Sequence, residues 1–471
     1  MAPEREPAPQ PITLYTWWNE AGERGARDAL EACFERLNPE LVNTIQFEGN
    51  LESTTACKAE GPSISNIVRC ETWRAMFGPS PPNTFQANAG ADLQRWLYHD
   101  DGDYEEGQEL LQELDSLPEL DEFWAKVPEA VRRAVSPSDD SLGPYLAVPL
   151  NIHRINLLFY SIALFEHLDA KDPQAHLLDR IQPGSNTTIE SATELVDVCQ
   201  RIREHDPLAI PIGLGVLEDA YPLVMLVFEN LLLSQAGAEQ YESLFTAPAI
   251  DFARDKEPVL RELLTVANQV FDACTTREHS ENLKWDAAIN EFVSGRAGSG
   301  VGPTYMLVSA DWALGTIKVA SEENGAGDFD LGERAMPGTS KYFVFTSDTF
   351  PLTRRALGQR EARKLLYSMT TEDCQLSFNH EKGSVPARRI DEDRLGSAGA
   401  SSDSSDARLR RVHELFHSKD VEHVLALSGL VPPRYLKEIQ EALLAFYIDG
   451  EADDVVYRMR NYDDMLGNEV H

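Results

Sequence analysis

An α/β fold with more than one domain is what this sequence predicts, and three observations lead to it. A strand-like run passes directly into a helical one between Ile12 and Leu37, and the same alternation continues along the chain. With 471 residues the chain is long enough for about two to four domains. Its apolar content of 42% is ordinary for a globular protein, and no apolar run approaches the ~20 residues that span a bilayer.

The opening segment predicts a strand that ends where a helix begins. Residues 12–15 form a short apolar and β-branched run, which is typical of a buried strand. Asn19 is a good N-cap, apolar residues then recur at three- and four-residue spacing, and the Asn-Pro pair at 38–39 ends the helix. In open α/β sheets, ligands bind beyond the carboxyl ends of the strands. Four side chains stand at that place: Trp17, Trp18, Glu20 and Glu23.

The rest of the first third repeats this rhythm. The pattern predicts a strand near 42–47, a helix from Ser63 to Met76, a short strand running into a glycine turn at 83–90, and a helix from 91. The long, apolar, β-rich stretch at 145–161 could pass from one lobe into another. A mostly helical pattern follows to about 309, and after it strand-like and helical segments alternate to the end of the chain.

The formal charge of −36 restricts the possible partners. Such an acidic chain repels polyanions, so nucleic acid and anionic membrane surfaces are excluded as partners. No phosphate-binding loop or dinucleotide fingerprint is present, and the acidic segment at 100–107 does not match the spacing of a calcium loop. We therefore expect neither a cofactor nor a metal site.

Six cysteines are present, and no two have the C-x-x-C spacing of a zinc or redox site. Cys33 falls on the apolar face of the first predicted helix, which favours a small buried core residue. Cys57 and Cys70 flank a Gly-Pro loop and could pair in an extracytoplasmic compartment.

The first eleven residues are polar and proline-rich and predict a tether. Met1 ahead of such a tether is what remains when an export signal is removed, and it is equally the start of a cytosolic protein.

Five segments in order resemble the carbohydrate-binding proteins of bacterial ABC importers, the class that includes maltose-binding protein, and most closely its glucose- and mannose-binding branch. These segments are TWWNEAGE at the start, VPLNIHRIN at 148–156, ADWALG from Ala310, MPGT from Met336 and HEKGSVPAR from His380. Their order and rough spacing match this family over nearly all of residues 12–450.

The resemblance implies a two-lobed periplasmic-binding-protein fold of type II, with a ligand cleft between lobes that close by a hinge motion. It places a tether at 1–11, the first lobe at 12–150 plus 311–347, and the second lobe at 151–310 plus 348–471. The chain is expected to cross between the lobes near 148–156, 302–311 and 346–351.

In the first lobe the resemblance implies that Glu23 and at least one of the two tryptophans, Trp17 and Trp18, contact the sugar. An indole can stack on the C–H face of a sugar ring, although tryptophans are also common in cores. Glu23 would accept hydrogen bonds from hydroxyl groups, or it would only stabilise the helix N-terminus. Asn88 stands where this branch often has Lys or His, which leaves the identity of the sugar open.

The resemblance also assigns ligand contacts at and after the expected crossings. Asn151 and Arg154 offer fixed hydrogen-bond donors, whereas His153 is either a ligand contact or a hinge residue. Asp311 would bind the sugar or cap a helix, and Trp312 would be a second aromatic platform. Three further candidates complete the set: Asp348 after the third crossing, Lys382 in the late Lys-Gly motif or in a solvated loop, and Tyr221, where the family has a tryptophan loop.

The function implied by the resemblance is a non-enzymatic, monomeric receptor. It would capture a mono- or small oligosaccharide in the periplasm, either free or lipid-anchored, and deliver it to ABC permease subunits. A sugar-sensing receptor for a signalling partner has the same fold and stays open. A glycoside hydrolase also uses acids and aromatics, but it needs two carboxylates at about 5 or 6.5–9.5 Å, and no pattern here pairs them.

Overall fold

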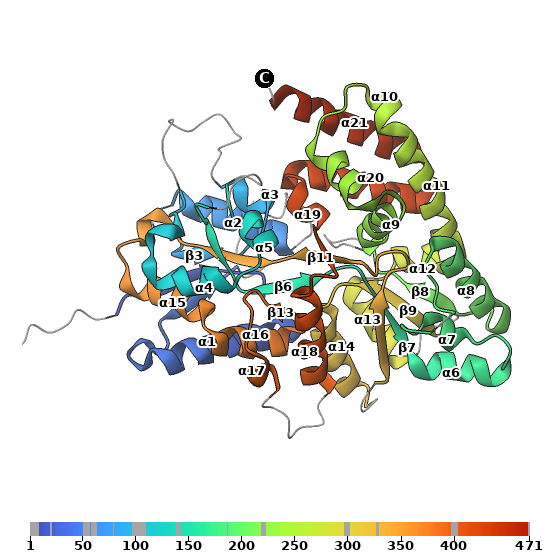
Figure 1. Ribbon diagram of the computed structural model, residues 1–471, viewed down its shortest axis with the longest axis horizontal. Helices are drawn as coiled ribbons and strands as arrows, with labels where there is room; N and C mark the ends of the chain where they lie inside the picture. The colour runs from blue at the N-terminus through green and yellow to red at the C-terminus, as the bar shows by residue number, and fades with distance from the viewer. Residues whose placement is uncertain are drawn as a thin grey trace, which may run out of the picture. The chain divides into compact units, whose positions relative to one another are not determined.

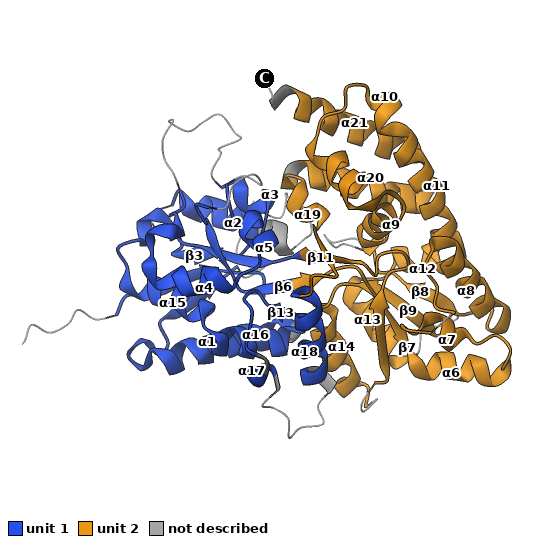
Figure 2. Ribbon diagram, viewed as in Figure 1, with its two compact units in different colours: residues 1–152, 346–417 blue, residues 153–345, 418–471 orange. Residues whose placement is uncertain are grey.

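The computed structural model describes residues 9–18, 21–49, 57, 64–78, 80–96, 110–137, 143–185, 187–217, 223–295, 302–325, 329–396 and 404–469. The chain divides into two compact units (Figures 1 and 2). Unit 1 comprises residues 1–152 and 346–417, and unit 2 comprises residues 153–345 and 418–471. In the part of the chain that the structure describes, no helix has both the length and the apolarity to cross a membrane.

Unit 1 contains a small parallel sheet in the order β2-β1-β3. Leu14 of the central strand lies opposite Phe47 on one side and Thr84 on the other. A second sheet is antiparallel, in the order β4-β12-β5, and a short β13 pairs with the start of β6 (Asn151–Arg154). The other strands of unit 1 are β1 (Ile12–Tyr15), β2 (Ile45–Glu48), β3 (Thr84–Phe85), β4 (Ala87–Asn88), β5 (Ala147–Pro149), β12 (Asp348–Pro351) and β13 (Val385–Pro386).

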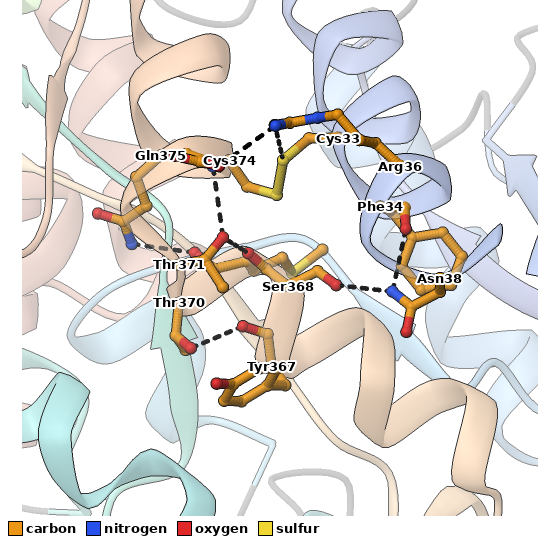
Figure 3. The surroundings of a disulfide bond; sticks show 12 residues. Cys33, Phe34, Arg36, Asn38, Tyr367, Ser368, Thr370, Thr371, Cys374 and Gln375 are labelled. Carbon is orange, nitrogen blue, oxygen red and sulfur yellow. Dashed lines mark hydrogen bonds and ion pairs between the residues drawn. A yellow bond between two sulfur atoms is a disulfide. The ribbon is translucent and has the colours of Figure 1, made fainter.

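Helices surround these sheets, and α1 and α16 pack against each other. The Cys33–Cys374 disulfide joins them, and beside it Asn38 donates hydrogen bonds to the Phe34 carbonyl and to Ser368 (Figure 3). The helices of unit 1 are α1 (Ala21–Leu37), α2 (Ile64–Met76), α3 (Ala91–Gln94), α4 (Asp121–Lys126), α5 (Glu129–Ala134), α15 (Arg360–Thr370), α16 (Glu372–Lys382), α17 (Glu392–Gly396) and α18 (Ser404–Phe416).

Unit 2 is built on a four-stranded sheet in the order β10-β7-β9-β8, in which β7, β8 and β9 are buried and largely apolar, whereas β10 alternates between buried and partly exposed residues. Within this sheet β8 and β9 run parallel, and the other neighbouring strands run antiparallel. In a different sheet, β11 pairs in parallel with β14. The strands are β7 (Leu157–Ser161), β8 (Ile210–Gly213), β9 (Thr304–Ser309), β10 (Leu331–Ala335), β11 (Tyr342–Thr346) and β14 (Glu422–Leu425).

Long amphipathic or apolar helices bury the core of unit 2, and the Cys199–Cys274 disulfide links two of them, α8 and α11. The helices of unit 2, long and short, are α6 (Ile162–Lys171), α7 (Leu177–Ile181), α8 (Ala192–His205), α9 (Leu223–Thr246), α10 (Phe252–Asp255), α11 (Glu257–Cys274), α12 (Arg277–Glu281), α13 (Trp285–Ser294), α14 (Ala313–Glu323), α19 (Leu427–Leu430), α20 (Pro433–Asp449) and α21 (Ala452–Glu469).

The division of the chain differs from the expected one in its later half. Residues 311–347, expected in the first lobe, lie almost entirely in unit 2, because β10 pairs with β7 along five residues and α14 packs on α13. Gly332 permits this pairing, since a Cβ atom there would collide with the Tyr160 ring. Residues 348–417, expected in the second lobe, belong to unit 1, where β12 lies between β4 and β5.

The three crossings follow from this division. The chain leaves unit 1 after Ile152 and returns after Phe345, which lie within or next to two of the expected crossings. The last crossing falls after His417, and none falls at 302–311, because β9 and its neighbours all belong to unit 2.

The cysteine pairing is more extensive than the sequence indicated. Cys57 and Cys70 are bonded, as the extracytoplasmic alternative expected. Cys33 is buried, but it is one half of a disulfide and not only a small core residue. The sequence could not pair it, because its partner lies 341 residues further along the chain.

Candidate functional site

The two tryptophans that follow β1 have different surroundings. Trp18 is completely buried, with its ring centroid 5.3 Å from that of Phe350 and 4.7 Å from that of Phe378. Trp17 keeps part of its surface exposed. Of the two candidates, Trp18 therefore has no exposed face in this structure, because its ring completes the core of unit 1. Trp17 is the indole that can offer a face to a sugar.

Trp17 is held through its backbone and through its ring. Its N–H donates to Gln86 Oε1 at 3.2 Å, and the Arg69 guanidinium lies 5.3 Å from its ring centroid. Arg69 comes from α2 and Gln86 from the turn between β3 and β4, so three separate segments meet at the end of β1. A cation over an indole face is attracted by the ring quadrupole.

Glu23 and Lys382, both predicted from the sequence, lie in direct contact. Lys382 Nζ donates to Glu23 Oε1 at 2.5 Å, and the ammonium group lies 5.7 Å from the Trp18 ring centroid. Lys382 is 3% exposed and is therefore not a solvated loop lysine, whereas Glu23 is 27% exposed. The pair combines a donor and an acceptor for hydroxyl groups at the edge where β1 ends.

Asp348 and Asn151 form a reciprocal buried pair in unit 1. Asn151 Nδ2 donates to Asp348 Oδ2 at 2.8 Å, and the Asp348 N–H donates to Asn151 Oδ1 at 2.8 Å. Gln86 Nε2 donates to the other carboxylate oxygen at 2.7 Å, and Thr16 in turn donates to Gln86 Oε1. This hydrogen-bonded network connects β6 and β12 to the residue that precedes Trp17.

Asn88 lies opposite Asp348 in the β4–β12 pairing and is partly exposed. Its N–H donates to Asp92 Oδ2 at 3.0 Å, an oxygen that also accepts from Arg69. Burial opposes the ionisation of Asp92, but Arg69 and Arg95 outweigh it and hold the pKa of that carboxyl below its usual value. The turn that contains Asn88 therefore lies beside Asp92, the carboxylate that holds Arg69 in place.

Unit 2 holds the second cluster of predicted residues. His153 Nδ1 lies 2.5 Å from Asp311 Oδ1, and the Arg154 N–H donates to Asp311 Oδ2 at 2.9 Å. A carboxylate can only accept, so His153 Nδ1 carries the proton in this contact. Asp311 is fully buried and provides no side-chain cap to α14, so its contacts orient His153 and the backbone beside it.

Trp312 and Arg154 complete this cluster. The His153 ring meets the Trp312 ring edge-on, with centroids 5.5 Å apart. Arg154 donates through Nε to Asn156 at 3.1 Å, and its guanidinium lies 5.3 Å from the Phe343 ring centroid. Trp312 is partly exposed, whereas Arg154 is 8% exposed.

Two predictions concern residues that lie outside the part of the chain that the structure describes. Tyr221 and the acidic segment at 100–107 lie outside the described residues. Within the described residues, no group of three or more His, Cys, Asp or Glu side chains is arranged to hold a metal ion.

Three residues of the site in unit 1 were missed by the sequence reasoning: Gln86, Arg69 and Asp92. Gln86 is 3% exposed, and a glutamine in a short strand gives no signal that it will be buried. A helix that contains Arg69 was predicted, but periodicity does not show which surface residue reaches a distant indole. The acidic residue two positions after a glycine turn could have suggested an anchor for a nearby cation.

Comparison with known proteins identifies the class of fold. No protein-family model matches the chain. An uncharacterised ABC transporter extracellular-binding protein of Pyrococcus horikoshii is 23% identical over 480 residues, covering 100% of this chain and 91% of its own length. A probable sugar-binding periplasmic protein of Rhizobium meliloti is 24% identical over 383 residues, which cover 81% of this chain and 77% of that protein.

Among solved structures, the bacterial solute receptor AcbH, described with an exclusive preference for β-D-galactopyranose, is similar to this chain. Its TM-score is 0.70 at 14% sequence identity, with 98% of this chain and 100% of that chain covered. A likeness at this identity shows the fold, and the predicted periplasmic-binding-protein fold class is confirmed.

Proposed function

We propose that this chain, which belongs to the extracellular solute-binding proteins of ABC transporters, captures a mono- or small oligosaccharide and delivers it to a membrane permease. The observation that carries the proposal is a partly exposed indole, Trp17, at the carboxyl end of a parallel strand. The Glu23–Lys382 pair belongs to the same edge, because α1 begins there. Sugar recognition needs this combination of an apolar platform with charged hydrogen-bonding groups.

Candidate contacts for a sugar are found in each unit taken by itself. In unit 1, Trp17 would remove the C–H face of a sugar ring from water, and Glu23 would accept from a hydroxyl group. In unit 2, the partly exposed Trp312 would offer a second apolar platform, beside the His153 ring that Asp311 orients through Nδ1. Asp311, Asn151 and Asp348 would orient these groups without touching the sugar, because all three are buried and hydrogen-bonded to other residues.

The proposed receptor is non-enzymatic and works outside the cytoplasmic membrane. Three disulfide bonds support this location, since such bonds form and persist in oxidising compartments. A sugar that binds the closed form better than the open form would shift the population toward closure, and a permease would recognise the closed form. The hinge motion, the monomeric state and a lipid anchor stay predictions of the resemblance.

Isothermal titration calorimetry tests the proposal directly. The folded protein is titrated with D-galactose, D-xylose, L-arabinose, raffinose and N,N′-diacetylchitobiose, and we expect saturable heat from at least one of them. Trp17→Ala should weaken that binding by about tenfold or more, whereas Tyr457→Ala, which truncates an exposed aromatic residue of α21, should not.

Two results would overturn the proposal. One is the absence of saturable heat from every carbohydrate with folded protein, and the other is wild-type affinity in the Trp17→Ala variant. Recovery of the bound sugar unchanged after long incubation is also required, because hydrolysed sugar would identify an enzyme.

A further inference from the structure

The Trp17 indole does not stand alone at the end of β1. The guanidinium of Arg69, in α2, lies 5.3 Å from its ring centroid, and this side chain is 14% exposed. A guanidinium plane over an indole restricts the rotation of the ring and occupies one of its two faces. The other face is then the one that can meet a sugar.

Asp92 fixes the position of Arg69. Asp92 Oδ2 accepts from Arg69 Nε at 3.1 Å and from Arg69 Nη2 at 2.9 Å, and the side chain of Asp92 is 2% exposed. The same oxygen accepts the Asn88 N–H, so the carboxylate is anchored to the β4 turn. Buried and charge-assisted hydrogen bonds of this kind are strong and directional. The guanidinium is therefore held by a rigid partner.

The backbone of Trp17 is fixed by an independent route. Its N–H donates to Gln86, and Gln86 donates to Asp348, which lies opposite Asn88 in the adjacent strand pair. Both routes meet at the same short segment, residues 86–92. Backbone and ring of the platform are therefore positioned from one structural element.

We propose that Arg69 is a positioning residue for sugar binding, which orders the Trp17 indole so that one defined face is ready for the ligand. The inference rests on the proposed function, in which Trp17 is the platform. An indole that is ordered before binding loses less side-chain freedom when the sugar arrives, so the affinity is higher. Lysine is a poor replacement, because an ammonium group cannot make two fixed N–H bonds to Asp92 while its plane covers the ring.

The first experiment measures the indole in the absence of any sugar. The protein is labelled with 5-fluorotryptophan, and Trp17→Phe identifies the ¹⁹F resonance of Trp17. Arg69→Met should shift and broaden this resonance, and Arg69→Lys should have an intermediate effect. Arg95→Met is the matched control, because Arg95 also faces Asp92 but its guanidinium lies over Trp96. It should leave the Trp17 resonance at its wild-type position.

The second experiment measures affinity by calorimetry with whichever of D-galactose, D-xylose, L-arabinose, raffinose and N,N′-diacetylchitobiose binds the wild-type protein. Arg69→Met should weaken binding by about three- to tenfold, with partial recovery in Arg69→Lys, as expected for the loss of one cation–π contact. An unchanged Trp17 resonance in Arg69→Met overturns the proposal. So does tighter sugar binding in that variant, which would make Arg69 a group that obstructs the indole.

The two experiments separate this inference from the proposed function. If none of the five sugars binds, the proposed function fails, while the ¹⁹F spectra still decide whether Arg69 orders Trp17. If a sugar binds and the Trp17 resonance is insensitive to Arg69, the proposed function stands and the positioning role is lost.

Discussion

Lys382, the last residue of α16, donates to Glu23 in the first turn of α1 over 2.5 Å, although the two residues are 359 positions apart. The Cys33–Cys374 disulfide joins the same two helices towards their opposite ends. The helices therefore run antiparallel within unit 1, with a covalent link at one end and an ion pair at the other. The ion pair is the end that faces the candidate site.

Replacing Glu23 with Ala should destabilise unit 1 by about 1–3 kcal/mol, because Lys382 would be left buried without its carboxylate partner. Urea denaturation measures this change. The double variant Glu23→Ala/Lys382→Met should lose less unfolding free energy than the single Glu23→Ala variant, since no buried charge is then left unpaired.

The control is the Arg133–Glu129 pair, in which both side chains are at least half exposed. Glu129→Ala should cost no more than about 0.5 kcal/mol, because solvent screens an exposed pair on one helix. If Glu23→Ala and Glu129→Ala lost the same unfolding free energy, the role assigned to the Glu23–Lys382 pair would be contradicted.

Removing the Cys33–Cys374 bond should destabilise unit 1 and weaken sugar binding. We expect the variant with both cysteines replaced by Ser to lose about 2–5 kcal/mol of unfolding free energy. Its amide protons in α1 and α16 should exchange faster in hydrogen–deuterium exchange, because the alignment that brings Glu23 to Lys382 is loosened.

The matched variant replaces Cys199 and Cys274, a buried pair of unit 2. It should accelerate exchange in α8 and α11 and leave α1 and α16 protected. Faster exchange in α1 after loss of Cys199–Cys274 would show that the effect is general destabilisation and not alignment of the two helices.

Glu229 should make unit 2 less stable as the pH rises. Burial raises the pKa of this carboxyl to about 7, against hydrogen bonds from Tyr241 and the Leu427 N–H that lower it. Between pH 4.5 and 7 the unfolded chain loses this proton while folded unit 2 keeps it, so unfolding free energy falls with rising pH, by up to about 1.4 kcal/mol per pH unit.

Glu229→Gln imitates the protonated acid and should remove this slope, as measured by exchange of α9 amides across pH 4.5–8. Glu239→Gln, in the exposed part of the same helix, is the control and should keep the slope. A slope that survives in Glu229→Gln would assign the pH dependence to another group.

His413 should make unit 1 less stable as the pH falls, which is the opposite of the pH dependence expected from Glu229 in unit 2. Burial lowers the pKa of this imidazole to about 4, despite its hydrogen bond to the Arg388 backbone. As the pH falls from 6.5 to 4, the unfolded chain takes up a proton that folded unit 1 excludes, so stability present above pH 6.5 is lost. His413→Gln should remove this loss of stability at low pH, as measured by hydrogen–deuterium exchange of the α18 amides. His176→Gln, at an exposed position, is the control and should leave the pH dependence unchanged.

The segments that carry the resemblance were placed well by the sequence, because each is a local pattern. The strand at 12–15 and the helix after it occur where periodicity predicts them, whereas the contact between Lys382 and Glu23 was not predicted. Which of two adjacent tryptophans is buried could not be predicted, since this depends on Phe350 and Phe378, which lie more than three hundred residues away in the chain.

The assignment of residues 311–347 failed for a related reason. β10 has an alternating pattern that any antiparallel neighbour could satisfy, and its pairing with β7 requires a glycine at 332, where a Cβ atom would collide with the Tyr160 ring. Buried networks such as Gln86 with Asp348 are equally invisible to periodicity, because each polar side chain in them is satisfied only by residues distant in sequence.

The span of the Cys33–Cys374 bond also affects how the protein must be made. Ribosomes release Cys33 long before its partner, which follows 341 residues later. Cys57 and Cys70 are the cysteines nearest to Cys33 in the sequence, and the bond between them, across 13 residues, keeps both from pairing with it. Losing either of these two cysteines would thus leave its former partner available to capture Cys33 in a nascent chain.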